Sequence, residues 1–388
     1  MSTRADQAVA LLERTWGQPV RLTGWRPFEP WSVAGATVRV GSRDEDVVVK
    51  WVRAGSVAHP GFRTHPGQAV REHATLRFVA DRVGTIAAHP IAPRPIAQAG
   101  DLQVMEDLSP RAILYDLLLA DPDEPALRAL GEMVDLLAEL HLATRGREAE
   151  YAAYLPPGWS TTRPPSDDPT GGNGGPARHQ APGVLDVPGL GYRTGSAPRP
   201  DPDALVELED LARRLVQPGE LHALSNGDAG PNNLLVAPGQ QARMIDFEFG
   251  GYQHALTDLL SLYLPHPGWI TATDPVATGL EQRYRDRMVT GAPVFGDDAV
   301  FGWELAAAAL AYALFRLRRF EVCDDRAPGD PSRLQLLVTA ESAAALAASR
   351  SAYPGIAAWL AAVGVALRHR WPETDLDISS LPDWLPRL

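Results

Sequence analysis

The chain has 388 residues and a formal net charge of −12, from 36 basic and 48 acidic side chains. This length suffices for two or three folding units whose cores need no disulfide support. The single cysteine, Cys323, excludes an intrachain disulfide and a cysteine-based zinc or iron–sulfur cluster, which favours a reducing, cytoplasmic setting. The negative charge disfavours nucleic acid and anionic membranes as partners and would accept a cationic small molecule.

The longest uninterrupted apolar run, residues 305–315, has 11 residues, against the roughly 20 that a membrane span requires. The first residues also lack the basic-then-apolar profile of a secretory signal. We therefore expect neither a membrane segment nor export. The oligomeric state is left open.

Lys50 is the only lysine, and every other basic residue is arginine. An ammonium group is a compact point charge, whereas a guanidinium is a planar fork, so this position requires the smaller group. Residues 46–52 are rich in valine and predict a strand buried on both faces. The alternative is an edge-strand lysine whose amine reaches water.

Residues 68–83 show helical spacing, and Glu72 falls on the same stripe as Leu76, Val79 and Val83. A carboxylate on an inward face requires a cation, because an unpaired buried charge is costly. A strand lysine followed by an inward helical glutamate is an arrangement that can fix a lysine against nucleotide phosphates. The pair also arises by chance in α/β chains.

Two short apolar runs, 234–236 and 243–247, flank the turn dipeptide Pro238-Gly239 and predict a β-hairpin. A loop centred near Gly239 and Gln240 would put Asn233 directly opposite Asp246. At that separation an amide oxygen and a carboxylate could bind one magnesium ion.

Asp228 lies in a glycine- and proline-containing loop five residues before Asn233. A loop aspartate next to two oxygen ligands provides a proton acceptor and a metal site, the parts that phosphoryl transfer needs. Taken singly, Asp228 reads as a turn aspartate and Asp246 as a strand-end cap; their combination favours the functional reading.

These motifs resemble the aminoglycoside phosphotransferase and choline kinase family. The resemblance rests on residues 226–236, 244–252 and Asp258, and it covers most of the chain. It implies an α+β, protein-kinase-like fold of two lobes: an antiparallel sheet lobe over residues 1–106 and a mainly helical lobe over residues 107–388.

The same resemblance implies roles for individual residues. Lys50 would contact the phosphates of ATP, with Glu72 holding it. Asp228 would be the catalytic aspartate, and Asn233 and Asp246 would bind Mg²⁺. Asp258 would steady the catalytic loop.

Further nucleotide contacts are expected near the sheet. Residues 102–108 resemble the hinge, whose backbone contacts the adenine, so Glu106 and Leu108 are candidates through their main-chain atoms. Ser32 is a candidate phosphate contact, although residues 23–41 contain no glycine-rich fingerprint. The family usually has histidine where this chain has Asn226, and often where it has Gly230; asparagine can replace the first by hydrogen bonding.

Helices are expected over residues 112–120 and 127–142, and His141 is expected in the core rather than in catalysis. Residues 155–202 are rich in proline and glycine and are expected to be a flexible insertion, either disordered or a lid. As a lid it would use Trp159, His179 or Tyr192.

The final third predicts a helical subdomain, with segments 304–320 and 333–351. In the family, acidic side chains line the acceptor cleft and hold amino groups of the acceptor. A charged cluster on a helix is, however, more often a solvated surface than a substrate-binding site. The candidates are Glu304, Glu321, Asp324 and Asp325, with Glu248 and Tyr252 nearer the metal.

The resulting hypothesis is a small-molecule kinase that transfers the γ-phosphoryl group of ATP to a hydroxyl of a polar metabolite such as an aminoglycoside or amino sugar, with antibiotic resistance as one outcome. The alternative, motivated by Asn226, is a catalytically silent nucleotide-binding module. Phosphorylation of protein side chains fits the motifs poorly.

Overall fold

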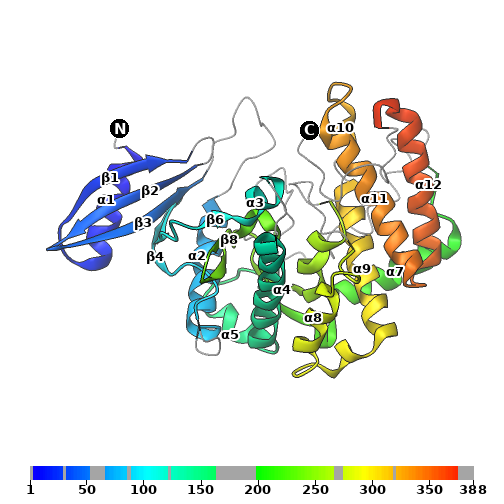
Figure 1. Cartoon of the computed structure of the whole chain (residues 1–388), viewed down its shortest axis with the longest axis horizontal. Helices are drawn as coiled ribbons and strands as arrows, with labels where there is room; N and C mark the ends of the chain where they lie inside the picture. The colour runs from blue at the N-terminus through cyan, green and yellow to red at the C-terminus, as the bar shows by residue number, and fades with distance from the viewer. Residues whose placement is uncertain are drawn as a thin grey trace.

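The structure is a computed structural model. It describes eight stretches of the chain, which are residues 3–28, 32–52, 66–84, 89–120, 124–162, 198–265, 274–317 and 320–374. A five-stranded antiparallel sheet forms one end of the molecule, and helices form the other (Figure 1). The α+β architecture expected from the sequence is therefore present.

The sheet has the strand order β1-β2-β3-β5-β4. Its strands are β1 (Val20–Pro27), β2 (Val33–Val40), β3 (Arg43–Trp51), β4 (Pro95–Ala99) and β5 (Leu102–Glu106). Helix α1 (Arg4–Trp16) packs on one face against β1 and β4, and its Leu11 and Leu12 belong to the same hydrophobic cluster as Val47 and Val49 of β3.

Because side chains alternate along a strand, Val48 and Lys50 lie on the opposite face of β3. That face is only half buried, and the side chain of Lys50 is 21% exposed. The strand predicted over residues 46–52 is confirmed, but the expectation that both faces are buried is wrong. The face of β3 that carries Lys50 is therefore accessible to side chains from other parts of the chain.

Helix α2 (Pro66–Arg82) packs against β4 and β5 and confirms the helix predicted from Glu72 and its stripe. Leu76, Val79 and Val83 are buried, as their spacing required. Glu72 is 1% exposed, so its carboxylate lies inside the molecule.

Strand β5 ends at Glu106, the residue proposed as the lobe boundary; the boundary itself stays a prediction. The next segment begins as a short strand, β6 (Ala112–Ile113), and only then becomes helix α3 (Leu114–Ala120). The helix predicted from residue 112 therefore starts two residues late, because Ala112 and Ile113 pair with strand β8.

The rest of the chain is mainly helical, with a central helix α4 (Glu124–Thr144). The other helices are α5 (Glu148–Ala152), α7 (Pro202–Val216), α8 (Leu280–Met288), α9 (Asp298–Leu317), α10 (Phe320–Asp324), α11 (Pro331–Ser349) and α12 (Pro354–Arg370). Short 3-10 turns occur at η2 (Gly219–Leu221), η3 (Pro231–Asn233), η4 (Ala255–Leu262), η5 (Pro293–Gly296) and η6 (Pro372–Thr374).

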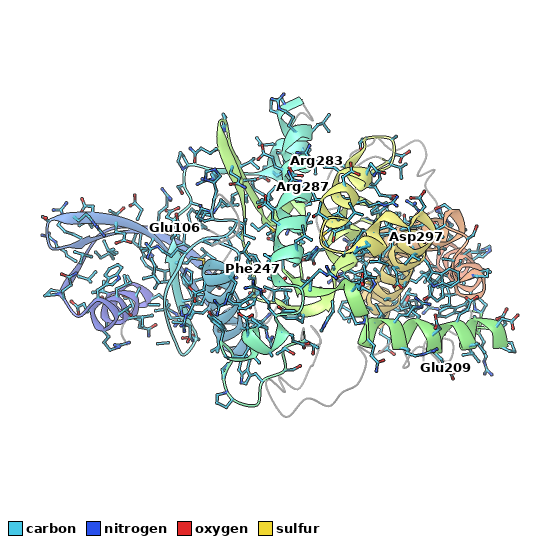
Figure 2. The ribbon with its side chains drawn as sticks, turned by 90° about the horizontal axis from the view of Figure 1, so that it is seen from below. Glu106, Glu209, Phe247, Arg283, Arg287 and Asp297 are labelled. Carbon is cyan, nitrogen blue, oxygen red and sulfur yellow. The ribbon has the colours of Figure 1, made fainter. Side chains whose placement is uncertain are left out.

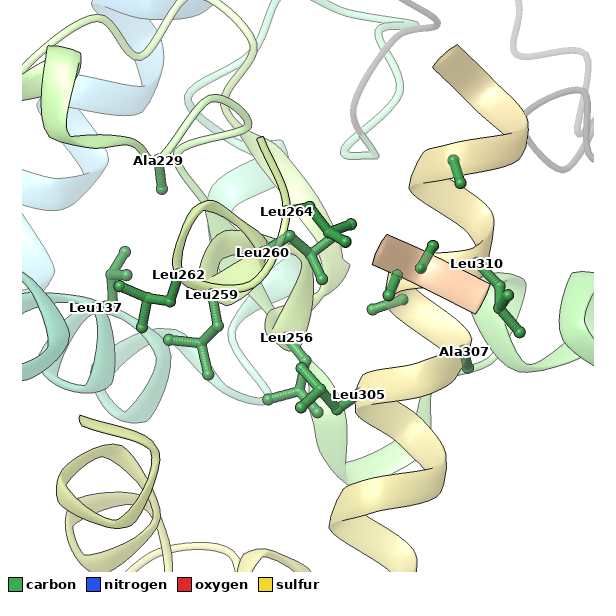
Figure 3. Packing of buried hydrophobic residues seen from close by; sticks show 14 of the residues in the cluster. Leu137, Ala229, Leu256, Leu259, Leu260, Leu262, Leu264, Leu305, Ala307 and Leu310 are labelled. Carbon is green, nitrogen blue, oxygen red and sulfur yellow. The ribbon is translucent and has the colours of Figure 1, made fainter. Parts of the chain in front are cut away.

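The segment η4 joins the main core. Figure 3 shows Leu262 beside Leu137 of α4 and Leu256 beside Leu305 of α9, so its leucines reach helices on two sides. Burial of apolar side chains on both sides fixes η4, which carries Asp258. Alanines let α9 pack closely with α11 and η4.

Helix α9 is, within the described ranges, the one helix long and apolar enough to cross a membrane by length and composition. Of its most apolar 18-residue window, 67% is buried inside the molecule, which is the behaviour of a core helix.

Strands β8 (Leu234–Ala237) and β9 (Gln240–Met244) form the predicted hairpin, but its register differs from the prediction. Ala237 pairs with Gln240 across the tight turn, whereas Leu235 pairs with Arg243, so β9 contains one extra residue between these pairs. This irregularity puts Asn233 opposite Ile245, whose N–H donates to the Asn233 carbonyl over 2.9 Å. Asp246 was predicted to lie opposite Asn233, but it follows Ile245 by one residue and lies outside strand β9.

Strand β7 (His222–Ser225) leads into the Asp228 loop and pairs with β10 (Gly251–His254). Of the predicted insertion 155–202, the described parts are 155–162 and 198–202, and α7 begins at Pro202. His179 and Tyr192 lie outside the described residues. The predicted helical lobe, 107–388, is described as far as residue 374.

Candidate active site

Lys50 lies among three carboxylates from three parts of the chain. Its Nζ is 2.9 Å from an oxygen of Glu72 on α2 and 3.2 Å from one of Glu248, and it also donates to Asp246. The structure thus brings Lys50, Glu72 and Asp246 together, as predicted. Glu248 is a fourth member.

The electrostatics of this cluster favour a charged amine. Burial alone would lower the pKa of Lys50, but Asp246, Glu248 and Glu72 together hold it well above its usual value. Burial raises the pKa of Glu72 and raises that of Glu248 to about 8, since burial disfavours the charged form; the neighbouring carboxylates add to this effect and Lys50 only partly opposes it. Fully ionised, the cluster would carry three negative charges against one positive charge, and the raised pKa of Glu248 means that it takes up a proton near neutral pH when no further cation is bound.

The loop after β9 turns sharply at Asp246, whose φ of 63° lies in the left-handed region. The N–H of Phe247 donates to Glu72 over 3.2 Å, so the glutamate that holds Lys50 also holds this loop. Figure 2 shows Phe247 beside α2.

The Asp228 loop is linked to the Asp246 loop by one side chain, Asn226. Its amide oxygen accepts from the N–H of Asp228 at 3.1 Å, and its Nδ2 donates to the carbonyls of Ile245 and Asp246, at 3.1 and 3.4 Å. Asn226 is 1% exposed, so no water competes for these bonds. The asparagine therefore positions the loop by hydrogen bonding, as expected.

Asn233 lies at the other end of the same loop. Its Nδ2 donates to the backbone oxygen of Asp228 at 2.8 Å and to a carboxylate oxygen of Asp228 at 3.1 Å. These bonds leave the amide oxygen of Asn233 as an acceptor. The predicted proximity of Asp228 and Asn233 is confirmed, while the direct pairing of Asn233 with Asp246 is not.

Asp258 of η4 holds the start of the Asp228 loop through hydrogen bonds. It accepts from the N–H of Asn226 at 3.2 Å and from the hydroxyl of Ser225, and it lies 3.1 Å from His141 Nε2. His141, fully buried, also contacts the hydroxyl of Tyr284 at 2.8 Å. These contacts agree with a structural part for both residues.

Gly227 permits the sharp turn of the loop. Its φ is 84°, and a Cβ at this position would lie 2.4 Å from the carbonyl oxygen of Phe249. Only glycine allows the two loops to approach this closely.

The predicted nucleotide contacts lie along the sheet. Ser32, at the start of β2, accepts from the N–H of Trp51 through its carbonyl at 3.0 Å, which places it beside Lys50 in the register. The Glu106 carboxylate accepts from Arg243 at 2.9 Å, so its side chain is engaged in a contact between β5 and β9. Leu108 is buried just after β5.

Three of the acceptor candidates, Glu304, Asp324 and Tyr252, are engaged in contacts within the fold. Glu304 accepts from Arg214 at 2.7 Å and lies 3.1 Å from His254 Nε2. Asp324 accepts from Arg370 and Trp371. The Tyr252 hydroxyl donates to the Thr144 carbonyl at 2.6 Å.

Glu321 and Asp325 are exposed on and just after α10. Their assignment to an acceptor stays a prediction.

The oxygen donors of this region suit a magnesium ion, which prefers carboxylate and carbonyl oxygens. Ligand oxygens of Glu72, Asp246 and Glu248 lie within 4.8 Å of one another. Glu72 is committed to Lys50 and Phe247, so Asp246 and Glu248 would hold the ion. Asn233 stays a predicted third ligand.

Sequence reasoning placed Glu248 near the metal only as an acceptor candidate and did not consider Arg71. The two acidic residues only two positions apart, Asp246 and Glu248, were the available signal. Arg71 gave a weaker signal, being a charged residue next to Glu72 on the inward part of a helix. It is 4% exposed.

A sheet lobe with a buried lysine–glutamate pair, joined to a helical lobe with an Asp–Asn loop, defines a protein of the kinase-like phosphotransferase class. The model of the phosphotransferase enzyme family matches residues 30–290, more than half of the chain. The chain belongs to this family, and the predicted resemblance and fold are confirmed.

Several solved structures are similar over most of their length. A choline/ethanolamine kinase family protein from Mesorhizobium loti is 16% identical, with TM-score 0.44 and coverage of 94% of this chain and 100% of that chain. The gentamicin complex of APH(2'')-IIa is 14% identical, with TM-score 0.47 and coverage of 88% and 97%. A thermostable mutant of APH(4)-Ia with ADP and hygromycin B is 14% identical, with TM-score 0.43 and coverage of 92% and 98%. No curated protein matches the chain.

Proposed function

We propose that this protein transfers the γ-phosphoryl group of ATP to a hydroxyl of a small polar acceptor, with an aminoglycoside or amino sugar as the first class to test. One observation carries the proposal: the side chain of Asn226 joins Asp228 to Asp246, which is ion-paired with Lys50. These bonds to the backbones of Asp228 and Asp246 support a single site that contains the proposed proton acceptor and the proposed phosphate-binding amine.

The residues divide the reaction between them. The acceptor hydroxyl loses its proton to the carboxylate of Asp228 while its oxygen forms a bond to the γ-phosphorus. The bond between that phosphorus and the bridging oxygen breaks, and ADP leaves. Lys50, kept charged by its carboxylates, would hold the phosphates in line.

Magnesium bound by Asp246, Glu248 and Asn233 would neutralise charge on the phosphates. The negative charge of the chain supports a cationic acceptor, since opposite charges attract it to the protein.

The test compares wild type, Asp228→Asn and the control Asp44→Asn, whose aspartate lies on the exposed end of β3 beside Arg39. Magnesium-dependent ADP release is measured with a panel of aminoglycosides, amino sugars and amino alcohols, and nucleotide affinity by calorimetry. We expect acceptor-stimulated release to fall about 10²- to 10⁴-fold in Asp228→Asn alone, with nucleotide affinity retained.

Undiminished transfer in Asp228→Asn would refute the assignment of the base. Nucleotide binding by wild type without ADP release for any acceptor would instead favour the silent nucleotide-binding module.

A further inference from the structure

Arg71 occupies an unusual position for a charged residue, inside the protein beside the Lys50–Glu72 pair. Its side chain is 4% exposed, and within the described residues no carboxylate pairs with it. It donates through Nη1 to the carbonyl of Gly250 at 3.3 Å and through Nη2 to the carbonyl of Ser160 at 3.0 Å. Its guanidinium also lies over the ring of Trp159, 5.5 Å from the centroid.

These contacts join three segments that are distant in sequence. Gly250 ends the loop that contains Asp246 and Glu248, and Ser160 belongs to residues 159–162. Residues 159–162 also contact the chain just after Gly250 directly, because the N–H of Tyr252 in β10 donates to the carbonyl of Thr161 at 2.8 Å. Arg71 thus connects helix α2 to the 246–250 loop and to residues 159–162.

A second set of contacts links α2 to the 246–250 loop one helical turn after Arg71, at Thr75. The Thr75 hydroxyl lies 2.8 Å from that of Tyr151, which in turn donates to Gly250 at 3.4 Å. A Cβ on Gly250 would lie 2.7 Å from Thr75, so the loop is pressed against the helix. Glu72, adjacent to Arg71, accepts from Phe247 in the same loop.

We propose that Arg71 is a positioning residue: it holds the 246–250 loop and residues 159–162 against α2, and thereby keeps Glu72 and Lys50 aligned with Asp246. For its effect on turnover, the proposal rests on the proposed function. A guanidinium suits this position because it presents two diverging donors and a flat face for Trp159, whereas an ammonium could satisfy only part of that set.

The test uses Arg71→Met, Arg71→Lys and the matched control Arg77→Met, which removes an exposed arginine of the same helix. Hydrogen exchange is measured on the full chain without ligands. We expect exchange in peptides covering 246–252 and 159–162 to accelerate about tenfold or more in Arg71→Met and less in Arg71→Lys, with no change in Arg77→Met.

Kinetics on the folded fraction provide the second readout. With an accepted substrate, kcat of Arg71→Met should fall about 10- to 100-fold while KM for ATP changes about threefold or less, because the fault is alignment rather than binding. In a Glu72→Gln background the same substitution should have a much smaller effect, because the alignment of Glu72 with Lys50 that the held loop maintains is already lost there.

Unchanged exchange in the two segments, or acceleration spread evenly over the chain with wild-type kcat, would overturn the proposal. If Arg71→Met does not fold, Arg71→Lys decides by the same criterion. The exchange measurement needs no substrate, so it stands even if no acceptor is phosphorylated and the proposed function fails.

Discussion

The carboxylates around Lys50 and those of the helical part of this protein differ in how their charge is compensated. Around Lys50, three carboxylates share one ammonium. In the helical part, Glu304 contacts Arg214 and His254, and Asp324 accepts from Arg370.

The difference separates a binding site from a structural ion pair. A balanced buried carboxylate is already satisfied by the fold, whereas an excess of carboxylates leaves the region short of positive charge. That deficit is what a divalent cation bound with a nucleotide would supply.

Removing the amine should have the largest effect. In Lys50→Met the three carboxylates lose their cation, and we expect catalytic efficiency to fall about 10²-fold or more. Unfolding free energy should drop by about 3–5 kcal/mol, because breaking a buried ion pair leaves uncompensated charge. Steady-state kinetics and urea unfolding measure the two. The control Arg39→Met, in an exposed ion pair on the same sheet, should change neither; retained activity in Lys50→Met would remove the lysine from the mechanism.

Glu304→Gln tests the balanced region. Burial opposes ionisation of this carboxyl, but His254 and Arg214 lower the pKa of Glu304 below its usual value. The substitution should cost about 3 kcal/mol of stability, seen as a lower urea midpoint. Turnover per folded molecule should remain that of wild type, and a selective loss of turnover would return Glu304 to the acceptor site.

Glu248→Gln is the matching change in the unbalanced region. Burial raises the pKa of Glu248 to about 8, so the stability tied to its protonated form is present at acidic pH and lost as pH rises through about 8. The glutamine variant should lack this loss, which falls between about pH 4.5 and pH 8, and its magnesium requirement for turnover should increase several-fold. An unchanged magnesium titration would exclude Glu248 as a ligand.

Asp324→Asn should have the smallest effect. Hydrogen bonds from Arg370 and Trp371 lower the pKa of Asp324 to about 2, against burial. Its contribution is therefore present above about pH 4 and lost as pH falls toward 2. After allowance for solvent screening we expect about 1 kcal/mol, measured as the difference in thermal stability between pH 5 and pH 2.5. Equal acid sensitivity of variant and wild type would contradict the assignment.

Local pattern was enough to predict the parts of the site that depend on periodicity. The Lys50 strand, the inward Glu72 and the Asp228–Asn233 pair follow from alternation, helical spacing and short loop length. These features involve few residues and little tertiary context.

Tertiary context decided the rest. The turn is closed by Ala237 and Gln240 and so lies closer to β8 than expected; the extra residue in β9 recovers only one of the two positions lost, which leaves Ile245 rather than Asp246 opposite Asn233. The left-handed turn at Asp246 directed Glu248 toward Lys50. The contacts of Arg71 join segments about 90 and 180 residues away, which no local pattern encodes.

The scarcity of lysine has a practical consequence for chemical labelling. Because Lys50 is the only lysine, an amine-directed reagent has one side-chain target in the chain, and that target lies in the site proposed for nucleotide. The carboxylates hold this amine largely protonated, which slows its reaction with a reagent that comes from solution. An acyl phosphate carried by a nucleotide would place its electrophile beside this amine, so the fraction of protein acylated would report occupancy directly by intact mass.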